Sequence, residues 1–265
     1  MVFAPAPVLT VTIERAGDDD ELHVHPGGQG IWQARMLRLF DVPVTLCTTL
    51  GGEVGAVLEP ALEREDLTLR TVRRDGTSGW SVHDRRGGER DEVAGAHGTP
   101  LSRHEIDELY GLALAEGLKA DVSVLSGTPD PTLVPADLYR RLAADLRANG
   151  ARVVADLSGD QLAAALAGGL DFLKVSHEEA VADGHAGDES EPELVRALHS
   201  LRDAGASMTA GVAAVLAEGG DLVDAVRTGA AAGALNVTRH GLGTGRAEAI
   251  AELIGRVTMS RREDA

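Results

Sequence analysis

Two hydrophobic patterns divide the chain near residue 100. Beyond that point, short apolar runs alternate with longer segments whose apolar residues recur at the spacing of one helix face. We expect strands at residues 121–125, 152–155 and 172–175. Alternating strands and helices are typical of βαβ units, so this part of the chain predicts a parallel sheet covered by helices.

Polar residues mark where the helices between these strands should begin. Ser102 and Glu105 form a capping-box pattern, and Ser158 and Gln161 repeat it farther along. Pro135 suits the first turn of the helix between them. Each of these three helices is therefore expected to start at or next to these positions.

The first 100 residues behave differently. Five short stretches separated by turn-forming residues predict strands, at residues 7–13, 21–25, 67–73, 79–83 and 89–93. Helices are expected at 29–39 and near 54–62, with a buried strand at 44–50 between them. We therefore predict a single domain of residues 1–265, whose α/β body carries a small β-sheet lid drawn from about residues 10–25 and 67–93.

The alternation of strands and helices fails at one place. Residues 193–203 predict a helix that ends at Gly205, and Ser207 immediately opens another. Two helices therefore meet where a strand should intervene. A natural deletion, an engineered deletion, or the omission of a segment from the sequence would each produce this junction.

The junction also carries a candidate anion site. Gly205, Ala206 and Ser207 form a turn of small residues, and Ser207 is placed to cap the following helix. Free backbone N–H groups and the positive end of the helix dipole suit an anion such as a phosphate. Close helix packing explains the small residues equally well.

The helix after Ser207 and the small-residue stretch 230–241 resemble the C-terminal signature of the PfkB (ribokinase-like) carbohydrate kinases. The resemblance implies a three-layer α/β/α fold with a mostly parallel central sheet, a β-sheet lid over the sugar, and the cofactors ATP and Mg²⁺. It places Asn236 and Gly241 in the nucleotide site. The family motif reads Gly-Ala-Gly-Asp-Ser, and Ala206 stands here in place of the catalytic Asp.

The sequence His-Pro-Gly-Gly-Gln-Gly before the first predicted helix resembles the family's sugar-binding turn. Adjacent glycines let backbone amides approach a hydroxyl-rich ligand, although an ordinary tight turn also explains them. The resemblance to the phosphofructokinase-like branch assigns Gly27, Gly28, Gln29 and Arg35 to the substrate, and Arg35 would suit a phosphate. Gln29 departs from the branch's frequent Lys, and Trp32 and Gln33 stand around its usual Asn.

Two further turns match the family weakly. Gly51 and Gly52 follow the predicted strand 44–50, and Ser126 follows the strand 121–125. Ligands of open α/β sheets bind outside the carboxyl ends of the strands, so both positions suit a substrate site. Their composition alone does not identify a ligand.

Residues 174–179 resemble the family's Lys-Pro-Asn-x-x-Glu motif. The resemblance implies that Lys174 and Ser176 contact the nucleotide and that Glu179 organises a magnesium ion through water. Ser176 and Glu179 also satisfy a plain capping box, which requires no metal. The two interpretations are compatible.

Composition narrows the class of protein. The formal net charge of -17 disfavours nucleic acid and anionic membranes as partners. The single cysteine, Cys47, lies in a predicted buried strand, so we expect a structural thiol. No apolar run approaches the roughly 18 residues of a membrane span, and no signal-peptide pattern opens the chain, so we expect a cytoplasmic protein.

The resemblance implies an ATP-dependent, phosphofructokinase-like kinase that transfers the γ-phosphoryl group to a hydroxyl of a sugar or sugar phosphate. The alternative is a family member that binds sugar phosphate or nucleotide without turnover, because the general base, which contributes about 10² to 10⁴-fold, is missing. A Rossmann-like oxidoreductase is a third interpretation, and it predicts nicotinamide binding. The resemblance also implies a homodimer formed through the lid, whose strand edges invite pairing.

Overall fold

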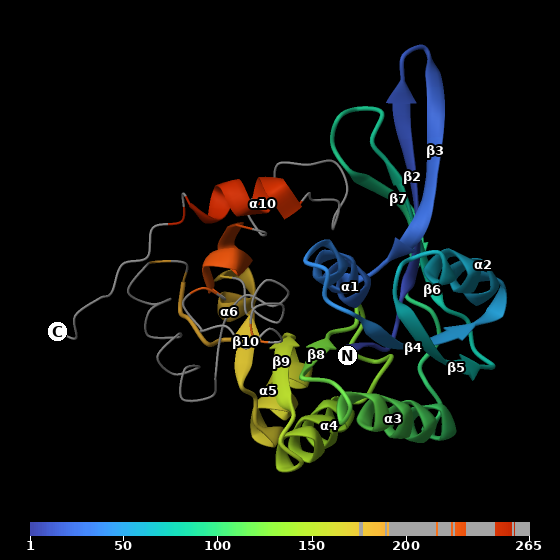
Figure 1. The fold of residues 1–265 in the computed structure, drawn as a ribbon. Coiled ribbons are helices and arrows are strands. Elements are labelled where there is room, and N and C mark those ends of the chain that lie inside the picture. Colours follow the sequence, from blue (N-terminus) through green and yellow to red (C-terminus); the bar gives the residue numbers. More distant parts are fainter. Residues whose placement is uncertain are drawn as a thin grey trace.

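The structure is a computed structural model that describes residues 1–174, 177–188, 190, 216, 224, 226–231, 247–255 and 257 (Figure 1). In these residues six parallel strands form the main sheet. Their order across the sheet is β10 (Phe172–Lys174), β9 (Arg152–Asp156), β8 (Val122–Ser126), β1 (Val2–Ala4), β4 (Thr45–Gly51) and β5 (Thr68–Arg74).

Helices cover both faces of the main sheet. One face packs against α1 (Gln29–Leu39) and α2 (Gly52–Glu63). The other packs against α3 (Arg103–Gly117), α4 (Ala136–Ala148) and α5 (Gly159–Gly168) (Figure 1). The described residues also include α6 (His177–Ala182) and α10 (Ala247–Ile254). The three-layer α/β/α arrangement predicted from the sequence is therefore confirmed.

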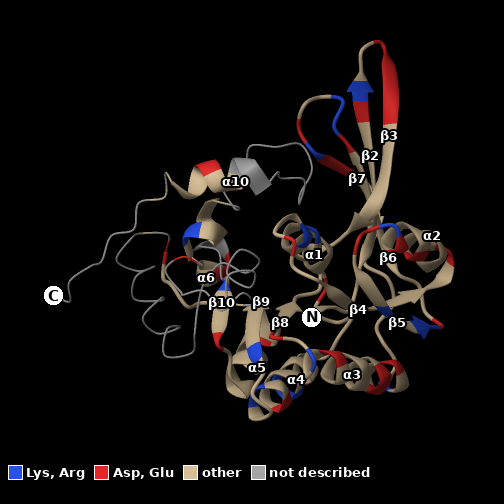
Figure 2. Ribbon diagram, viewed as in Figure 1, with Lys and Arg blue, Asp and Glu red and all other residues tan. Residues whose placement is uncertain are grey.

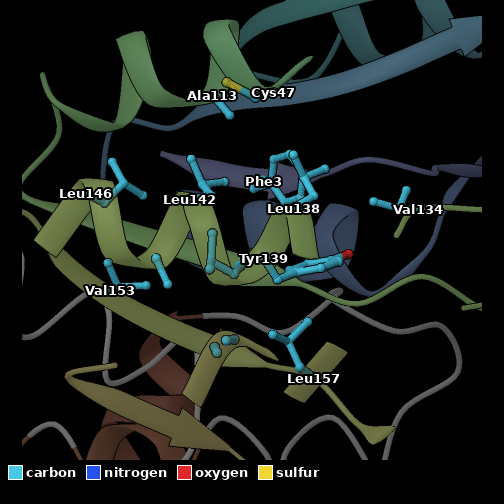
Figure 3. Close-up of a cluster of buried hydrophobic side chains, with 14 of the residues drawn as sticks. Phe3, Cys47, Ala113, Val134, Leu138, Tyr139, Leu142, Leu146, Val153 and Leu157 are labelled. Atoms are coloured by element: carbon cyan, nitrogen blue, oxygen red, sulfur yellow. The ribbon is translucent and has the colours of Figure 1, made fainter. Parts of the chain in front are cut away.

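The larger hydrophobic cluster lies beneath α4 (Figure 3). Leu138, Leu142 and Leu146 recur at helical spacing and are fully buried against the sheet. The rings of Phe3 and Tyr139 meet edge to face, with centroids 5.6 Å apart. The Tyr139 hydroxyl donates a 3.0 Å hydrogen bond to a main-chain carbonyl, so burial of this ring leaves no polar atom unpaired.

A second sheet forms the lid, and Figure 1 shows it projecting from the body. Its order is β3 (Asp19–Gly27), β2 (Val8–Ala16), β6 (Gly79–Asp84) and β7 (Asp91–Ala96). The hairpins β2–β3 and β6–β7 are antiparallel, whereas β2 and β6 pair in parallel. The lid therefore combines two segments of chain that lie on either side of α1, β4, α2 and β5.

The structure corrects one expectation about the strands and adds one strand that the sequence did not predict. Residues 67–73 were assigned to the lid, but β5 pairs in parallel with β4 at the edge of the main sheet. The strand signal is local and does not identify the partner, which here is reached through the α2 crossover. The pattern also gave no prediction for β1, which has three residues and lies between β8 and β4.

Of the three predicted capping boxes, one is confirmed and one is wrong, and the third includes Ser176, which lies outside the described residues. The Ser102 hydroxyl accepts a hydrogen bond from the Glu105 N–H at 3.3 Å, and the Glu105 carboxylate accepts one from the Ser102 N–H at 2.6 Å. Ser158 does precede α5, but its side chain makes no capping bond. Gln161 instead donates to the Thr128 hydroxyl at 2.9 Å, because a buried amide must find its partners within the fold.

The predicted helix at 193–203, its junction with the next helix, and the cap at Ser207 lie outside the described residues. Within the part of the chain that the structure describes, no helix is both long enough and apolar enough to cross a membrane.

Candidate active site

The main sheet has a topological switch point at β1. The chain passes from β1 to β4 and β5 on one side, and later through β8, β9 and β10 on the other. Ligands of open α/β sheets bind outside the carboxyl ends of the strands at such a point. A cavity of about 400 Å³ lies there, lined by Ala4 and Ala6 at the end of β1 and by Gly127 and Thr128 after β8.

The lid supplies a second wall of this cavity, lined by Thr10 of β2 and by Ser81 and His83 of β6. Thr10 is paired with Ser81 in the register of the two strands, and residues two apart on one strand share a face. The Nε2 atom of His83 lies 2.9 Å from the Ser81 hydroxyl. The buried Nδ1 atom of His83 has no hydrogen-bond partner among the described residues.

A glycine turn leads into α1 at the edge of the cavity. Gly28 precedes the helix with φ at 106°, a conformation that favours glycine. Its carbonyl accepts hydrogen bonds from the N–H groups of Ile31 and Trp32 at 3.1 and 3.2 Å. Gly30 allows close packing, since a Cβ atom there would lie 2.5 Å from that of Ala4. The first turn of α1 is thereby held against the end of β1.

A chain of polar side chains joins the carboxyl ends of three neighbouring strands. Ser126 ends β8, Asp156 ends β9 and Lys174 ends β10. Gln33 of α1 connects the first two, because its Oε1 accepts from the Ser126 hydroxyl and its Nε2 donates to Asp156 Oδ2 at 2.8 Å. The Nζ atom of Lys174 lies 3.2 Å from Asp156 Oδ1 and 3.4 Å from Glu179 Oε2.

The charges of this network support one another. Burial raises the pKa of Asp156, and the ammonium group of Lys174 opposes that rise. Burial alone would lower the pKa of Lys174, but the carboxylates of Asp156 and Glu179 raise it above its ordinary value. Lys174 therefore stays protonated at neutral pH, between two carboxylates of which one, Glu179, lines the cavity.

The structure brings several predicted substrate residues together. Gly28 and Gln29 line the cavity. Gly27 is buried beside them, where a Cβ atom would collide with the side chain of Thr10. Ser126 is fully buried and bound to Gln33, while its neighbour Gly127 reaches the cavity wall. The glycine turn and the end of β8 thus meet at one place.

Three other predicted substrate residues do not line the cavity. Arg35 donates from Nε to both carboxylate oxygens of Glu65 at 2.9 Å. Gly51 ends β4 and Gly52 begins α2, and a Cβ atom on Gly51 would collide with the carbonyl of Gly76. Close packing therefore accounts for Gly51, and a positive φ of 66° accounts for Gly52. The role of this pair in substrate binding stays a prediction, as does that of Arg35.

The structure describes only some of the residues predicted to contact the nucleotide and the magnesium ion. Lys174 and Glu179 are described, whereas Ser176, Asn236, Gly241 and the turn 205–207 lie outside the described residues. Within the described ranges, no group of three or more His, Cys, Asp or Glu side chains could hold a metal ion. The two carboxylates around Lys174 nevertheless offer the oxygen donors that Mg²⁺ prefers, which fits contact through water.

Sequence reasoning assigned no role to three residues of this site: Gln33, Asp156 and His83. Asp156 carried a usable signal, because it follows an apolar strand as Ser126 and Lys174 do. His83 stands two residues from Ser81 in a predicted strand, so a shared face could have been inferred. The part played by Gln33 depends on contacts with distant strands and gave no local signal.

Comparison with known proteins identifies the family. A model of the pfkB family carbohydrate kinases matches residues 9–208. The 1-phosphofructokinase of Bacillus subtilis (strain 168) is 29% identical over 157 residues, which are 58% of this chain and 50% of that protein. The matched part therefore spans about half the length of that curated relative.

Solved structures share the fold over nearly the whole chain. Phosphofructokinase-2 from Escherichia coli in complex with potassium has a TM-score of 0.82 and 21% identity, covering 96% of this chain and 97% of that one. A possible 1-phosphofructokinase from Thermotoga maritima has 0.83 and 16%, covering 99% of each chain. Ribokinase from Arabidopsis thaliana, complexed with ribose and ATP, has 0.68 and 14%, covering 96% and 97%. The resemblance inferred from the sequence is confirmed, and the chain belongs to the PfkB family of carbohydrate kinases.

Proposed function

We propose that the chain binds a sugar or sugar phosphate in the cavity beneath the lid and transfers to it the γ-phosphoryl group of ATP. The position of the cavity carries this proposal, because it combines the switch point of the main sheet, the lid and the Gly27-Gly28 turn. Two similar proteins are described with such ligands. They are the Escherichia coli phosphofructokinase-2 in complex with fructose-6-phosphate and the Arabidopsis ribokinase complexed with ribose and ATP.

The residues of the candidate site divide between two tasks. Gln29, Ser81 and His83 offer hydrogen-bonding groups to the hydroxyls of a carbohydrate. Lys174 offers a positive charge, and Glu179 a carboxylate, on the side of β10. Bound Mg²⁺ would neutralise charge on the phosphoryl groups, and Glu179 would hold it through water. For Ser176, Asn236 and Gly241, contact with the nucleotide stays a prediction.

The transfer step lacks its expected general base. Ala206 occupies the position of the family's Asp, and Asp203 is the nearest acidic residue before it in the sequence. General-base catalysis contributes about 10² to 10⁴-fold, so we expect turnover reduced by that factor relative to a family member that has the Asp. The same observation favours a second function, in which the chain binds its ligands without turnover.

We also propose a homodimer formed through the lid, in the cytoplasm. Leu22, Val24 and Val93 lie on lid strands and are 62%, 50% and 64% exposed. Covering these side chains would remove apolar surface from water. Sedimentation of the Val24→Glu variant beside the wild type tests the interface. If the Val24→Glu variant forms a dimer as the wild type does, the lid is not the dimer interface.

Two measurements on the full chain separate the proposed functions. Calorimetric titration with sugars, sugar phosphates and ATP with Mg²⁺ measures binding, and a coupled assay measures ADP release. Binding with slow, sugar-dependent ADP release supports the kinase. Binding without ADP release supports the second function. If no sugar, sugar phosphate or nucleotide binds, both are overturned.

A pair of serine variants ties the binding to the cavity. Ser81→Ala removes a hydroxyl from the lid wall, and we expect weaker carbohydrate binding. Ser190→Ala removes an exposed hydroxyl outside the cavity lining and serves as the matched control. Equal affinities for the two variants would place the carbohydrate elsewhere.

A further inference from the structure

Gln33 places a buried amide on the face of α1 that packs against the main sheet. The residue is 6% exposed, and its neighbours on the helix, Ile31 and Ala34, are fully buried. An amide in such a place gains over an apolar side chain only through the hydrogen bonds that it makes. Gln33 makes two, one with Ser126 and one with Asp156. The groups that it holds therefore explain an amide at this position.

The two partners fix which way the amide points. An ionised carboxylate accepts hydrogen bonds but cannot donate them, so the Nε2 atom of Gln33 faces Asp156 Oδ2, at 2.8 Å. The Oε1 atom of Gln33 then accepts a hydrogen bond from the Ser126 hydroxyl. Both ends of the amide are held, and α1 is itself packed against the sheet. Gln33 is thus a fixed donor to one oxygen of Asp156.

The second oxygen of Asp156 faces a different partner. Oδ1 lies 3.2 Å from the Nζ atom of Lys174, and the side chain of Asp156 is 10% exposed. Burial raises the pKa of Asp156, whereas the Lys174 ammonium and a hydrogen bond from Gln29 oppose this rise. Gln29 and Gln33 are four positions apart, so they lie on one face of α1. The helix therefore contacts this carboxylate through two successive turns.

The contacts continue from Asp156 to the cavity. The Lys174 ammonium lies 3.4 Å from Glu179 Oε2, and these two side chains are 30% and 31% exposed. Glu179 lines the cavity. Exposure thus rises from 6% at Gln33 to 31% at Glu179. A lysine side chain has several rotatable bonds, so a half-exposed ammonium group keeps one position only if a fixed group holds it.

This inference rests on the proposed kinase function and concerns a residue outside the cavity lining. We propose that Gln33 is a positioning residue for the nucleotide side of the site, at Lys174 and Glu179. Its amide holds Asp156 in one orientation. Asp156 in turn holds the Lys174 ammonium beside Glu179, where the phosphoryl groups and Mg²⁺ of ATP would bind. Replacing residues that orient a metal-binding group from behind typically changes metal affinity by about 10- to 100-fold.

Gln33→Met tests the assignment, because methionine has a similar length and volume but neither the donor nor the acceptor. Calorimetric titration of the full chain with Mg²⁺ and a non-hydrolysable ATP analogue measures binding, and we expect the affinity to fall about tenfold. Gln161→Met is the matched control. It also removes a buried amide, 4% exposed, but one that donates to Thr128 and not to Asp156. This control should change the affinity by less than about twofold.

Two further variants identify the hydrogen bond that matters. Gln33→Glu keeps the shape and the acceptor for Ser126 but loses the donor to Asp156, so it should weaken nucleotide binding at least as much as Gln33→Met. In the Asp156→Asn background, Gln33→Met should have little further effect, because the two residues act in series. The inference is overturned if Gln33→Glu binds the nucleotide as the wild type does, if Gln33→Met costs the same affinity in both backgrounds, or if the control costs as much as Gln33→Met.

The lysines give a readout that needs no bound ligand. The chain has two, Lys174 and Lys119, and the side chain of Lys119 is 68% exposed. In protein that contains isotopically labelled lysine, Gln33→Met should shift the side-chain NMR signal of Lys174 and leave that of Lys119 in place. Lys119→Arg assigns the two signals. An unmoved Lys174 signal overturns the inference, even if Gln33→Met lowers the stability of the protein.

The outcomes separate this inference from the proposed function. If the wild type binds the ATP analogue and Gln33→Met binds it equally well, the positioning role is wrong and the kinase proposal stands. If the wild type binds no sugar, sugar phosphate or nucleotide, the kinase proposal fails and this inference fails with it. A shifted Lys174 signal would then report only a structural contact. Urea denaturation of Gln33→Met and Gln161→Met shows that both variants are folded under the conditions of the titration.

Discussion

The main sheet and the lid are stabilised in different ways. The main sheet lies between two clusters of buried apolar side chains, with helices on both faces. The lid exposes Leu22, Val24 and Val93, and among the described residues no hydrophobic cluster is centred on it. Among the described residues, the main sheet is therefore packed on both faces, whereas the lid has exposed apolar side chains.

Ion pairs take the place of a core at the outer end of the lid. Figure 2 shows acidic residues along the outer part of β3 and basic residues at the end of β2. Arg86 contacts Asp20 at 2.9 Å and Asp84 at 2.6 Å, and Arg85 contacts Glu14 at 3.3 Å. Exposed pairs of this kind contribute little to stability, so the lid can open at smaller cost than the body.

The largest expected effect is a loss of stability in the core of the main sheet. Leu142→Ala removes a fully buried side chain beneath α4, and we expect the free energy of unfolding to fall by about 2–5 kcal/mol. Leu22→Ala is the matched substitution in the lid, and it should change the free energy of unfolding of the monomer by less than about 0.5 kcal/mol. Urea denaturation followed by circular dichroism measures both. Similar losses would show that the two regions are packed alike.

A smaller effect is expected where the body meets the cavity. A Cβ atom on Gly30 would lie 2.5 Å from the Cβ of Ala4 and 2.8 Å from the Ser126 hydroxyl. Gly30→Ala should therefore push α1 away from β1 and cost about 1–3 kcal/mol in thermal denaturation. Gly111→Ala in α3 meets no atom within 4 Å and should stabilise the helix by about 0.5–1 kcal/mol. A neutral Gly30→Ala would show that α1 can shift freely.

The capping box of α3 contributes less to stability than the close packing at Gly30. Ser102→Ala should cost about 1 kcal/mol, and Ser158→Ala, which removes no capping bond, should cost clearly less. Burial alone would raise the pKa of Glu105, but hydrogen bonds from Ser102 and Asp75 lower it below 4.5. The contribution of the ionised Glu105 carboxylate to stability is therefore present above pH 4.5, and it is lost as the pH falls through the lowered pKa. Chemical denaturation at neutral and acid pH measures it, and equal losses from the two serine variants would contradict the assigned cap.

The smallest effect belongs to the lid. Hydrogen bonds from Arg86 lower the pKa of Asp84 to about 2. The interaction is therefore present above pH 3.8 and is lost as the pH falls through about 2. NMR titration of the carboxyl should show that Arg86→Gln moves this pKa back toward 3.8, while Arg103→Gln, an exposed arginine of α3, leaves it in place. If the pKa of Asp84 is unchanged in Arg86→Gln, the Arg86–Asp84 ion pair does not stabilise this carboxylate.

The sequence was most informative where the signal is local. The predicted helix at 29–39 coincides with α1, because a glycine turn and a helical apolar stripe mark the same segment. The cap of α3 was predicted for the same reason. The glycine turn at the cavity also followed from local composition, together with the family resemblance.

The rest depends on contacts between distant residues. Nothing near β5 indicates that it pairs with β4 instead of the lid strands. Gln33 and Asp156 are 123 positions apart, so their hydrogen bond follows only from the docking of α1 on the sheet. The same holds for Arg35, whose partner Glu65 lies beyond the next strand and helix. Local patterns therefore located the walls of the site, whereas the pairing of its polar groups required the fold.

The parallel pairing of β2 with β6 constrains when the lid can form. The ladder joins Val8–Ile13 to Gly79–Asp84, and the chain between them forms β3, α1, β4, α2 and β5. Contacts of such long sequence separation form late in folding because they close a large loop. The amides that join β2 to β6 should thus gain protection from hydrogen exchange after those within the local β2–β3 hairpin, and an excised lid peptide would lack the scaffold that aligns its two hairpins.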